Sequence, residues 1–518
     1  MSFTTSLHAV AERTNQQFEK RSLSIAACYS ALFFAVAGCF ATIKLLWFDE
    51  FITLYVVRFQ SLSGLWNVLK SGVELNPPLF HLLTRLSSVV FGETPLGLRL
   101  PAMIGFWLAG ICIFLFVRRR TTPLFAALAV LFTFCTASFG YAYEARPYGV
   151  VLGCCGLSLL AWQSLTDSRH RRLALIGLGA SLGAAVSCHY YAILLLAPIA
   201  AGELVKTVQL RKMDYPAWVF MLAGISPLLL YIPLIRSALG VHQSEHVWNR
   251  PQIPFLWESY QSLLGNAWIP LAIIFIWAAF HKFHDRPERP RDPLPYHEVV
   301  AVSVLVFLPI IGFAVASDVT NMISERYVLS SIAGCGIAFA FACWKVGNRR
   351  SVFALVCACM LLIWFCALQI SHMRDVVAAR STWSNPELNA ILRSRNIPIL
   401  VKPYVSLEFE HYGAPEFRSR IVCVIDSKRK HLYSDDDTPE RLMTAGRSIF
   451  PIKYEEFETF RQQTDSFFIF GGPVGSVEDS VISGGGSVTI AYWKAKYQSP
   501  LMLATSTKDR SSSSSMIP

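Results

Sequence analysis

Residues 22–48 read SLSIAACYSALFFAVAGCFATIKLLWF, and the acidic residues Asp49 and Glu50 follow directly. This apolar stretch exceeds the roughly 20 residues that a helix needs to cross a bilayer. It lacks a small-residue cleavage site, so we expect it to stay in the protein as a membrane span. Ionisable side chains at a membrane boundary are costly to bury and usually need partners, which makes Asp49 and Glu50 candidate functional residues.

The whole chain has the composition of a membrane protein. Of its 518 residues, 53% are hydrophobic and 16% are charged, against about 25% charged in an average soluble domain. The mean hydropathy is +0.42. We expect a mainly α-helical, polytopic protein with about eleven spans, at approximately 22–46, 97–117, 123–140, 147–165, 173–189, 192–206, 214–234, 267–281, 298–316, 327–344 and 351–371.

Lysine and arginine orient these spans. The net charge of +11 comes largely from clusters such as RRR, RHRR, RPERPR and NRR, which all fall in loops on one side. The positive-inside rule therefore predicts a cytoplasmic N-terminus, and an odd number of spans places the C-terminal region outside. No basic patch on a soluble domain points to nucleic acid. Because no N-x-S/T sequon occurs, a bacterial inner membrane is favoured over the endoplasmic reticulum.

The expected domain organisation has five parts. Residues 1–21 form a cytoplasmic N-terminus, and 22–371 a transmembrane domain whose outer loop, 47–96, carries juxtamembrane helices. Residues 77–92 are short for a span and contain His81 and Arg85, so they suit a helix lying in the interface. Reading them as a span would reverse every later loop and break the charge pattern.

The chain becomes less apolar after Arg374. Residues 372–384 are predicted to be a linker, 385–499 a small α/β extracytoplasmic domain, and 500–518 a disordered tail. Short apolar runs at IPILV, RIVCVID and FFIFG predict buried strands of a parallel or mixed sheet. Asn385 followed by Pro386 predicts a helix start. The segment GGPVGSVEDS lacks the lysine of a P-loop, so nucleotide is not an expected ligand.

Two other expected outer loops carry charged residues. YAYEARPYG (141–149) contains Glu144 and Arg146, and NMISERYV contains Arg326 and Tyr327. An arginine can hold a phosphate with two parallel hydrogen bonds. The alternatives are a Glu144–Arg146 pair that pins its loop, and an ordinary interfacial anchor at Arg326 with Tyr327 in the aromatic belt.

His189 and Tyr190, in CHYYA, end another expected span. Aromatic rings there could bind a ligand by stacking, or belong to an interfacial belt. For Asp49 and Glu50 the alternative is an interfacial pair neutralised by nearby cations such as Lys44. No CxxC pair occurs, so no metal site is predicted among these residues, although a divalent cation is left open as a cofactor.

The order of these motifs resembles a known superfamily. FDE (48–50), ELNPPLFH (74–81), LGLRLPAMIG (96–105), YAYEARPYG and SERY (324–327) are similar in sequence and order to the GT-C integral-membrane glycosyltransferases. Within them, the chain is most similar to the dolichyl-phosphate-mannose protein mannosyltransferase and aminoarabinose transferase group (glycosyltransferase family 39-like).

The resemblance implies a role for each candidate residue. Asp49 would be the catalytic base, assisted by Glu50. The donor phosphate and sugar would be bound by Glu144, Arg146, Arg326, Tyr327, His189, Tyr190 and Asn76. Asn76 departs from one branch, in which a lysine before the paired prolines contacts phosphate, so the cations elsewhere would carry more of that task.

The function implied is transfer of a sugar, with inversion, from a polyprenyl-phosphate carrier to a glycan, lipid or protein acceptor at the outer face. The alternative is a polytopic transporter or lipid flippase without transferase activity. Transporters place their charges near the bilayer midplane and often contain repeats, whereas here the charges gather at span ends and no repeat is visible.

Overall fold

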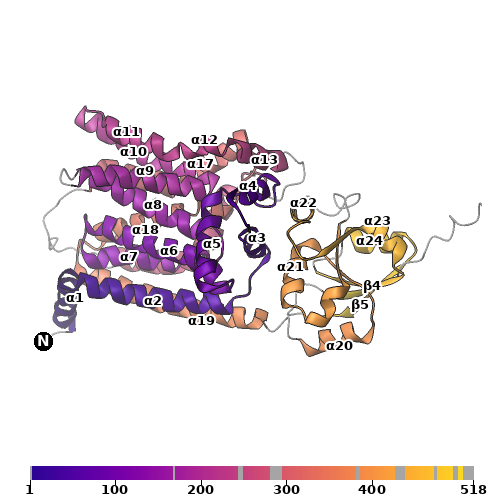
Figure 1. The fold of residues 1–518 in the computed structure, drawn as a ribbon. Helices are drawn as coiled ribbons and strands as arrows, with labels where there is room; N and C mark the ends of the chain where they lie inside the picture. The colour runs from indigo at the N-terminus through magenta and orange to yellow at the C-terminus, as the bar shows by residue number, and fades with distance from the viewer. Residues whose placement is uncertain are drawn as a thin grey trace, which may run out of the picture. The chain divides into compact units, whose positions relative to one another are not determined.

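The structure is a computed structural model that describes residues 3–166, 170–242, 249–280, 294–380, 385–425, 438–471, 475–493 and 500–505. It contains two compact units (Figure 1). The first, called here the helical unit, comprises Met1–Ile43, Leu75–Leu239 and Asn249–Arg374. The second, called the lobe, comprises Lys44–Glu74, Gly240–Trp248 and Asp375–Pro518. The lobe is therefore built from separate stretches of chain, and the first of them contains Asp49 and Glu50.

Helices make up the helical unit. They are α1 (Phe3–Lys20), α2 (Ser22–Ile43), α5 (Pro78–Phe91), α6 (Pro95–Arg118), α7 (Pro123–Phe134), α8 (Tyr148–Gln163), α9 (Arg171–Cys188), α10 (Leu196–Leu210), α11 (Tyr215–Ile225), α12 (Pro227–Leu230), α13 (Ile232–His242), α14 (Phe255–Leu264), α15 (Trp268–Phe280), α16 (Tyr296–Val306), α17 (Leu308–Val315), α18 (Ser331–Val346) and α19 (Ser351–Arg380). Short 3-10 segments, η1 (Ala137–Tyr143), η3 (Tyr190–Leu195) and η6 (Glu325–Val328), lie between them.

Helices α6 and α8 are in backbone contact. A Cβ placed on Gly149 would lie 2.4 Å from the carbonyl oxygen of Ala102, and one on Gly153 would lie 2.5 Å from that of Gly105. Small residues allow such close approach in membrane helices, where van der Waals packing drives association. The fully buried Arg99 of α6 donates a hydrogen bond of 2.8 Å to the carbonyl oxygen of Ala41, which ties α6 to the end of α2.

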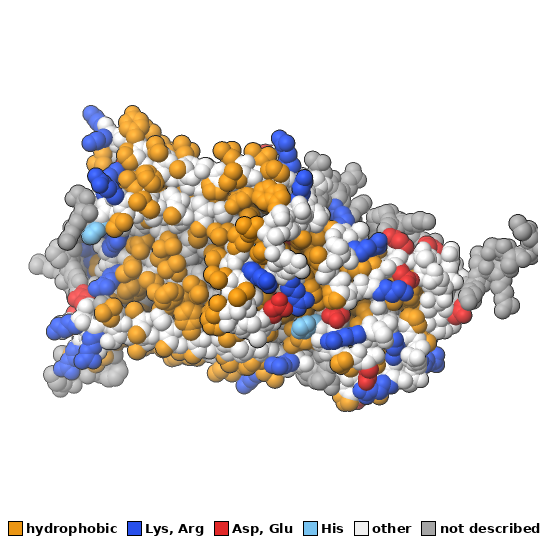
Figure 2. Space-filling model, in the orientation of Figure 1, with side chains coloured by type: hydrophobic (Ala, Val, Ile, Leu, Met, Phe, Trp, Pro, Cys, Tyr) orange, Lys and Arg blue, Asp and Glu red, His pale blue; other side chains and the backbone are white. Residues whose placement is uncertain are grey.

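Seven described helices are long and apolar enough to cross a membrane, or up to ten if each of three bent pairs counts as one span. The expected polytopic helical fold is confirmed. Ten of the eleven expected spans match these segments, and the eleventh corresponds to α18, which has only 16 residues. Helix α5, with 14 residues, is also too short to count. Figure 2 shows apolar side chains across one face of the helical unit, with lysine and arginine gathered at its left-hand end.

The lobe contains a mixed sheet in the order β3-β2-β1-β4-β6-β5. Its strands are β1 (Ile399–Val401), β2 (Ile421–Ile425), β3 (Lys453–Glu456), β4 (Ser466–Phe470), β5 (Ser487–Tyr492) and β6 (Leu501–Thr505), and its helices are α3 (Phe48–Val56), α4 (Leu62–Lys70), α20 (Pro386–Ser394), α21 (Pro403–Tyr412), α22 (Thr438–Ala445), α23 (Phe457–Gln463) and α24 (Ser476–Ser483). Strands β1–β4 pair in parallel, while β6 pairs antiparallel with β4 and β5.

Apolar cores cover both faces of this sheet. One contains side chains from α23 and α24, including Phe457 and Val481. The other contains Leu392 of α20 and Phe409 of α21. The expected helix start is present, because the Asn385 side chain accepts from the first amides of α20.

Three boundaries differ from those expected. The sheet continues to Thr505, since β6 pairs with β4 through residues such as Phe468 and Leu503. The prediction that a disordered tail begins at residue 500 was therefore wrong for Leu501–Thr505. Helix α19 runs to Arg380, through most of the expected linker. Residues 44–74 belong to the lobe rather than to the transmembrane domain, and within them Phe48 and Phe51 of α3 pack on α21.

Candidate functional site

The acidic pair lies in the first turn of α3. Glu50 is fully buried, and its carboxylate accepts a hydrogen bond of 3.4 Å from the backbone amide of Trp47. It thereby satisfies one of the amides that a helix start leaves without an intrahelical partner. Asp49 is half-buried. The two neighbouring acids therefore have different environments, with Glu50 as a helix cap and Asp49 as the more accessible carboxylate.

Helix α21 of the lobe holds α3 through aromatic contacts. Phe48 stacks on Tyr404 with ring centroids 5.1 Å apart, and Phe51 contacts His411 at 5.1 Å. The Tyr412 hydroxyl accepts a hydrogen bond of 2.7 Å from the Leu46 amide. Aromatic pairs of this kind contribute about 0.5–1.5 kcal/mol each beyond their buried area. The segment that carries Asp49 is thus fixed within the lobe.

A carboxyl group of α21 faces the start of α3. Glu408 accepts a hydrogen bond from the Phe48 amide and lies near Glu50. Burial, reinforced by the Glu50 charge, raises the pKa of Glu408 from 4.5 to about 7, against the lowering effect of the Phe48 hydrogen bond. Ionisation of Glu408 near neutral pH therefore adds a further negative charge beside Glu50.

In the helical unit, three loops distant in sequence meet in a cluster of aromatic rings. His189 contacts Tyr327 with centroids 4.8 Å apart and Tyr148 at 5.6 Å. Tyr191 contacts Tyr327 at 5.1 Å. The Arg326 guanidinium carbon lies 5.8 Å from the Tyr148 ring centre, within the range of a cation–π contact. The structure therefore brings the predicted His189, Arg326 and Tyr327 together.

Backbone turns and short 3-10 segments position these side chains. His189 precedes η3, and its Nδ1 accepts a hydrogen bond of 3.2 Å from the Tyr191 amide. The Tyr191 hydroxyl donates to the carbonyl oxygen of Met322 and bonds to Thr320, which links η3 to the segment before Arg326. These hydrogen bonds position the Tyr191 ring and the segment that leads to Arg326, although neither lies in a regular α-helix.

The predicted Glu144–Arg146 segment lies beside this cluster. Arg146 is buried and its amide donates to the Glu144 carbonyl oxygen at 2.7 Å, which makes a tight turn. Tyr141, whose ring contacts Tyr148, is within electrostatic reach of Glu144 and Arg326. A cluster of aromatic rings and arginines of this kind can hold a phosphate together with the apolar face of a sugar.

Two predicted residues are less closely connected to these clusters. Tyr190 is half-buried at the start of η3, and its neighbour Tyr191 supplies the ring that contacts Tyr327. Asn76 is buried directly before α5. Sequence reasoning missed Tyr148 and Glu408. Tyr148 stands in the quoted motif 141–149, so its position was available, whereas no local pattern distinguishes Glu408.

Comparison with known proteins identifies the fold. The model of the dolichyl-phosphate-mannose-protein mannosyltransferase family matches residues 75–231. ArnT from Cupriavidus metallidurans, solved bound to undecaprenyl phosphate, superposes with a TM-score of 0.56 over 93% of this chain and 98% of that chain, at 12% identity. The chain has an ArnT-like fold. The apo state of the same ArnT gives the same values, and the resemblance expected from the sequence is confirmed.

AglB from Archaeoglobus fulgidus, in complex with an inhibitory peptide and a dolichol-phosphate, matches with a TM-score of 0.41 and 10% identity, over 88% of this chain and 70% of that chain. No curated protein matches the sequence significantly. Within the ArnT-like fold, the mannosyltransferase match contains Asn76, Glu144, Arg146 and His189, but neither Asp49 nor the region of Arg326. Among the described residues, no three His, Cys, Asp or Glu side chains gather as metal ligands.

Proposed function

We propose that this protein is a membrane glycosyltransferase that moves a sugar from a polyprenyl-phosphate carrier to an acceptor, with inversion at the sugar carbon. The observation that carries the proposal is the convergence of Arg326, Tyr148, His189 and Tyr327 from three separate loops. The ArnT-like fold supports it, since the matched ArnT was solved with undecaprenyl phosphate.

The proposed chemistry needs a base and a stabilised leaving group. Asp49 takes the proton of the acceptor hydroxyl as that oxygen attacks the sugar carbon. Arg326 and Arg146 neutralise the charge that develops on the departing polyprenyl phosphate. Glu50, which is occupied as a helix cap, supports the position of Asp49 rather than accepting a proton itself.

Replacement of Asp49 by asparagine tests the base. We expect release of polyprenyl phosphate from the lipid-linked sugar to fall by about 100-fold to 10,000-fold, with unchanged thermal stability. The donor is first identified by mass spectrometry of lipid that co-purifies with the wild type. Asp465→Asn, on the exposed surface of the lobe, is the matched control. Turnover within a factor of three of the wild type would reject Asp49 as the base.

A transporter or flippase is the second candidate. Three helix pairs bend by 81°, 62° and 55° at short breaks, and interrupted helices are common in transporters. A flippase would carry the labelled lipid across a vesicle membrane with the sugar–phosphate bond intact. The same lipid incubated with the transferase would lose its sugar only when an acceptor is present.

We also propose that the site faces the outside of a bacterial inner membrane, with the N-terminus in the cytoplasm. The proposal rests on the lysine and arginine clusters in alternate loops. A soluble, impermeant thiol reagent applied to intact spheroplasts should label a cysteine introduced at Glu93 and not one introduced at Arg211. The reverse pattern would invert the topology.

A further inference from the structure

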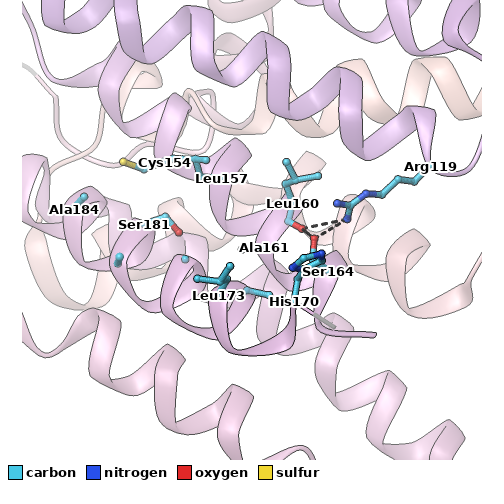
Figure 3. Close-up of a pocket in the computed structure, with 13 residues that line it drawn as sticks. Arg119, Cys154, Leu157, Leu160, Ala161, Ser164, His170, Leu173, Ser181 and Ala184 are labelled. Carbon is cyan, nitrogen blue, oxygen red and sulfur yellow. Dashed lines mark hydrogen bonds between the residues drawn. The ribbon is translucent and has the colours of Figure 1, made fainter. Parts of the chain in front are cut away.

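A cavity of about 500 Å³ lies along helices α8 and α9 of the helical unit. Its walls are mostly apolar and include Leu157, Leu173 and Ala184. Figure 3 shows Arg119, Ser164 and His170 together at one end, with Cys154 and Ala184 toward the other. The cavity is therefore an apolar groove with a polar mouth, and it uses none of the residues assigned to sugar transfer.

The groove exists because small side chains face each other on its floor. A Cβ placed on Gly177 of α9 would lie 3.6 Å from the Cβ of Ala161 on α8, an ordinary contact distance. Ala174 and Ala180 also line the cavity. A larger residue at Gly177 would consequently extend into the groove without forcing the two backbones apart.

The mouth is cationic and its arginine is held in place. Arg119 Nη1 donates to Ser164 Oγ at 2.8 Å and to Gln163 Oε1 at 3.2 Å. His170 is exposed directly before α9. Among the residues that the structure describes, no acidic side chain lines the cavity. The neighbouring Arg171 pairs with Asp214 at 2.5 Å. Arg119 is the arginine that lines the cavity.

We propose that this groove binds an anionic glycerophospholipid, with one acyl chain along α8 and α9 and the phosphate at Arg119 and His170. Charge complementarity selects this occupant, because the mouth carries positive charge and hydrogen-bond donors while the groove is apolar. Arginine is the side chain best suited to phosphate oxygens. Cations near a membrane surface draw anionic lipids to them.

Native mass spectrometry of the full-length protein tests the site. The protein is incubated with equimolar phosphatidylglycerol and phosphatidylcholine of the same acyl chains, and retained lipid is counted. We expect one phosphatidylglycerol to be retained preferentially. Arg119→Gln should lower this retention about fivefold, the effect expected for one cation near the surface, and Arg119→Lys should restore most of it.

Two further variants separate binding from folding. Gly177→Leu fills the groove but leaves Arg119 and its hydrogen bonds intact, so it should abolish retention even if Arg119→Gln folds poorly. Arg118→Gln changes the adjacent arginine, which does not line the cavity, and should have no effect. Equal retention of both lipids, or an equal loss with Arg118→Gln, would overturn the proposal. Displacement of the lipid by polyprenyl phosphate, or groove-dependent formation of a dimer, would also reject it in favour of that other occupant.

Discussion

Replacing Glu408 by glutamine should strengthen the contact between α3 and α21 at alkaline pH and leave it nearly unchanged at about pH 4, below both pKa values of Glu408. Glutamine keeps an oxygen that can accept from the Phe48 amide, but it removes the charge that ionisation places beside Glu50. The variant therefore separates the charge of Glu408 from its hydrogen bond. It also tests whether α21 controls the segment that carries Asp49.

The magnitude follows from the pKa of Glu408, which is raised from 4.5 to about 7. A carboxyl group with a raised pKa in the folded state binds a proton that the open state releases, so the contact weakens as pH rises from about 4.5 through 7. At about 1.4 kcal/mol per unit of pKa, the full cost above pH 7 is about 3 kcal/mol. Partial solvent screening reduces this to about 1–2 kcal/mol.

Hydrogen–deuterium exchange of α3 is the assay, because it reports local opening. At pH 8 the amides of Phe48–Val56 should exchange about fivefold to thirtyfold more slowly in Glu408→Gln than in the wild type. At about pH 4, below both pKa values of Glu408, the two proteins should agree. Comparing them at the same pH removes the intrinsic pH dependence of exchange. Glu416→Gln, which removes an exposed partner of Arg393, is the control. An equal ratio at both pH values would refute the reasoning.

Three further outcomes are expected. Tyr412→Phe removes the acceptor of the Leu46 amide and should accelerate exchange in α3 about fivefold, from the roughly 1 kcal/mol of one hydrogen bond. Arg99→Met leaves the Ala41 carbonyl oxygen without this donor and should lower the free energy of unfolding by about 1–3 kcal/mol, seen as a lower thermal midpoint. Arg326→Gln should weaken binding of a polyprenyl phosphate more at low salt than at high salt, because salt screens the charge of the arginine. Isothermal titration at low and high ionic strength measures this difference.

Each of these outcomes has a contrary result. Unchanged exchange in Tyr412→Phe would mean that the ring contacts alone fix α3. An unchanged midpoint in Arg99→Met would show that water replaces the arginine. Equal lipid affinity of Arg326→Gln and wild type at low salt would remove Arg326 from the donor site, while leaving the ArnT-like fold untouched.

Much of the lobe follows from local sequence. Three apolar runs became β1, β2 and β4, because strands buried on both faces are continuously apolar. Asn385 caps α20 as expected. Strand β6 was not recognised in the same way, since its place in the sheet depends on pairing with β4 and β5. Helix α21 mixes aromatic and charged residues, because one face serves the core and another faces α3.

The candidate site likewise contains residues that local sequence identifies and contacts that it does not. The motif residues Arg326 and His189 could be chosen from the sequence because cations and rings at span ends suit a lipid phosphate. Their meeting through Tyr148 and Tyr191 depends on loops far apart in the chain. The contact between Leu46 and Tyr412 joins residues separated by 366 positions, and no local pattern encodes such a pair.

The lobe is built from an early and a late segment of the chain, so it can be completed only near the end of synthesis. Helix α3 leaves the ribosome long before α21, and at about 5–20 residues per second the intervening chain takes roughly 20–70 s to make. During that interval α3 lacks the helix that accepts its first amide and stacks on its rings. If Asp49 is the base, the enzyme has no ordered base until its C-terminal segment is complete. An unfinished or C-terminally clipped chain would then occupy the membrane without consuming lipid-linked sugar.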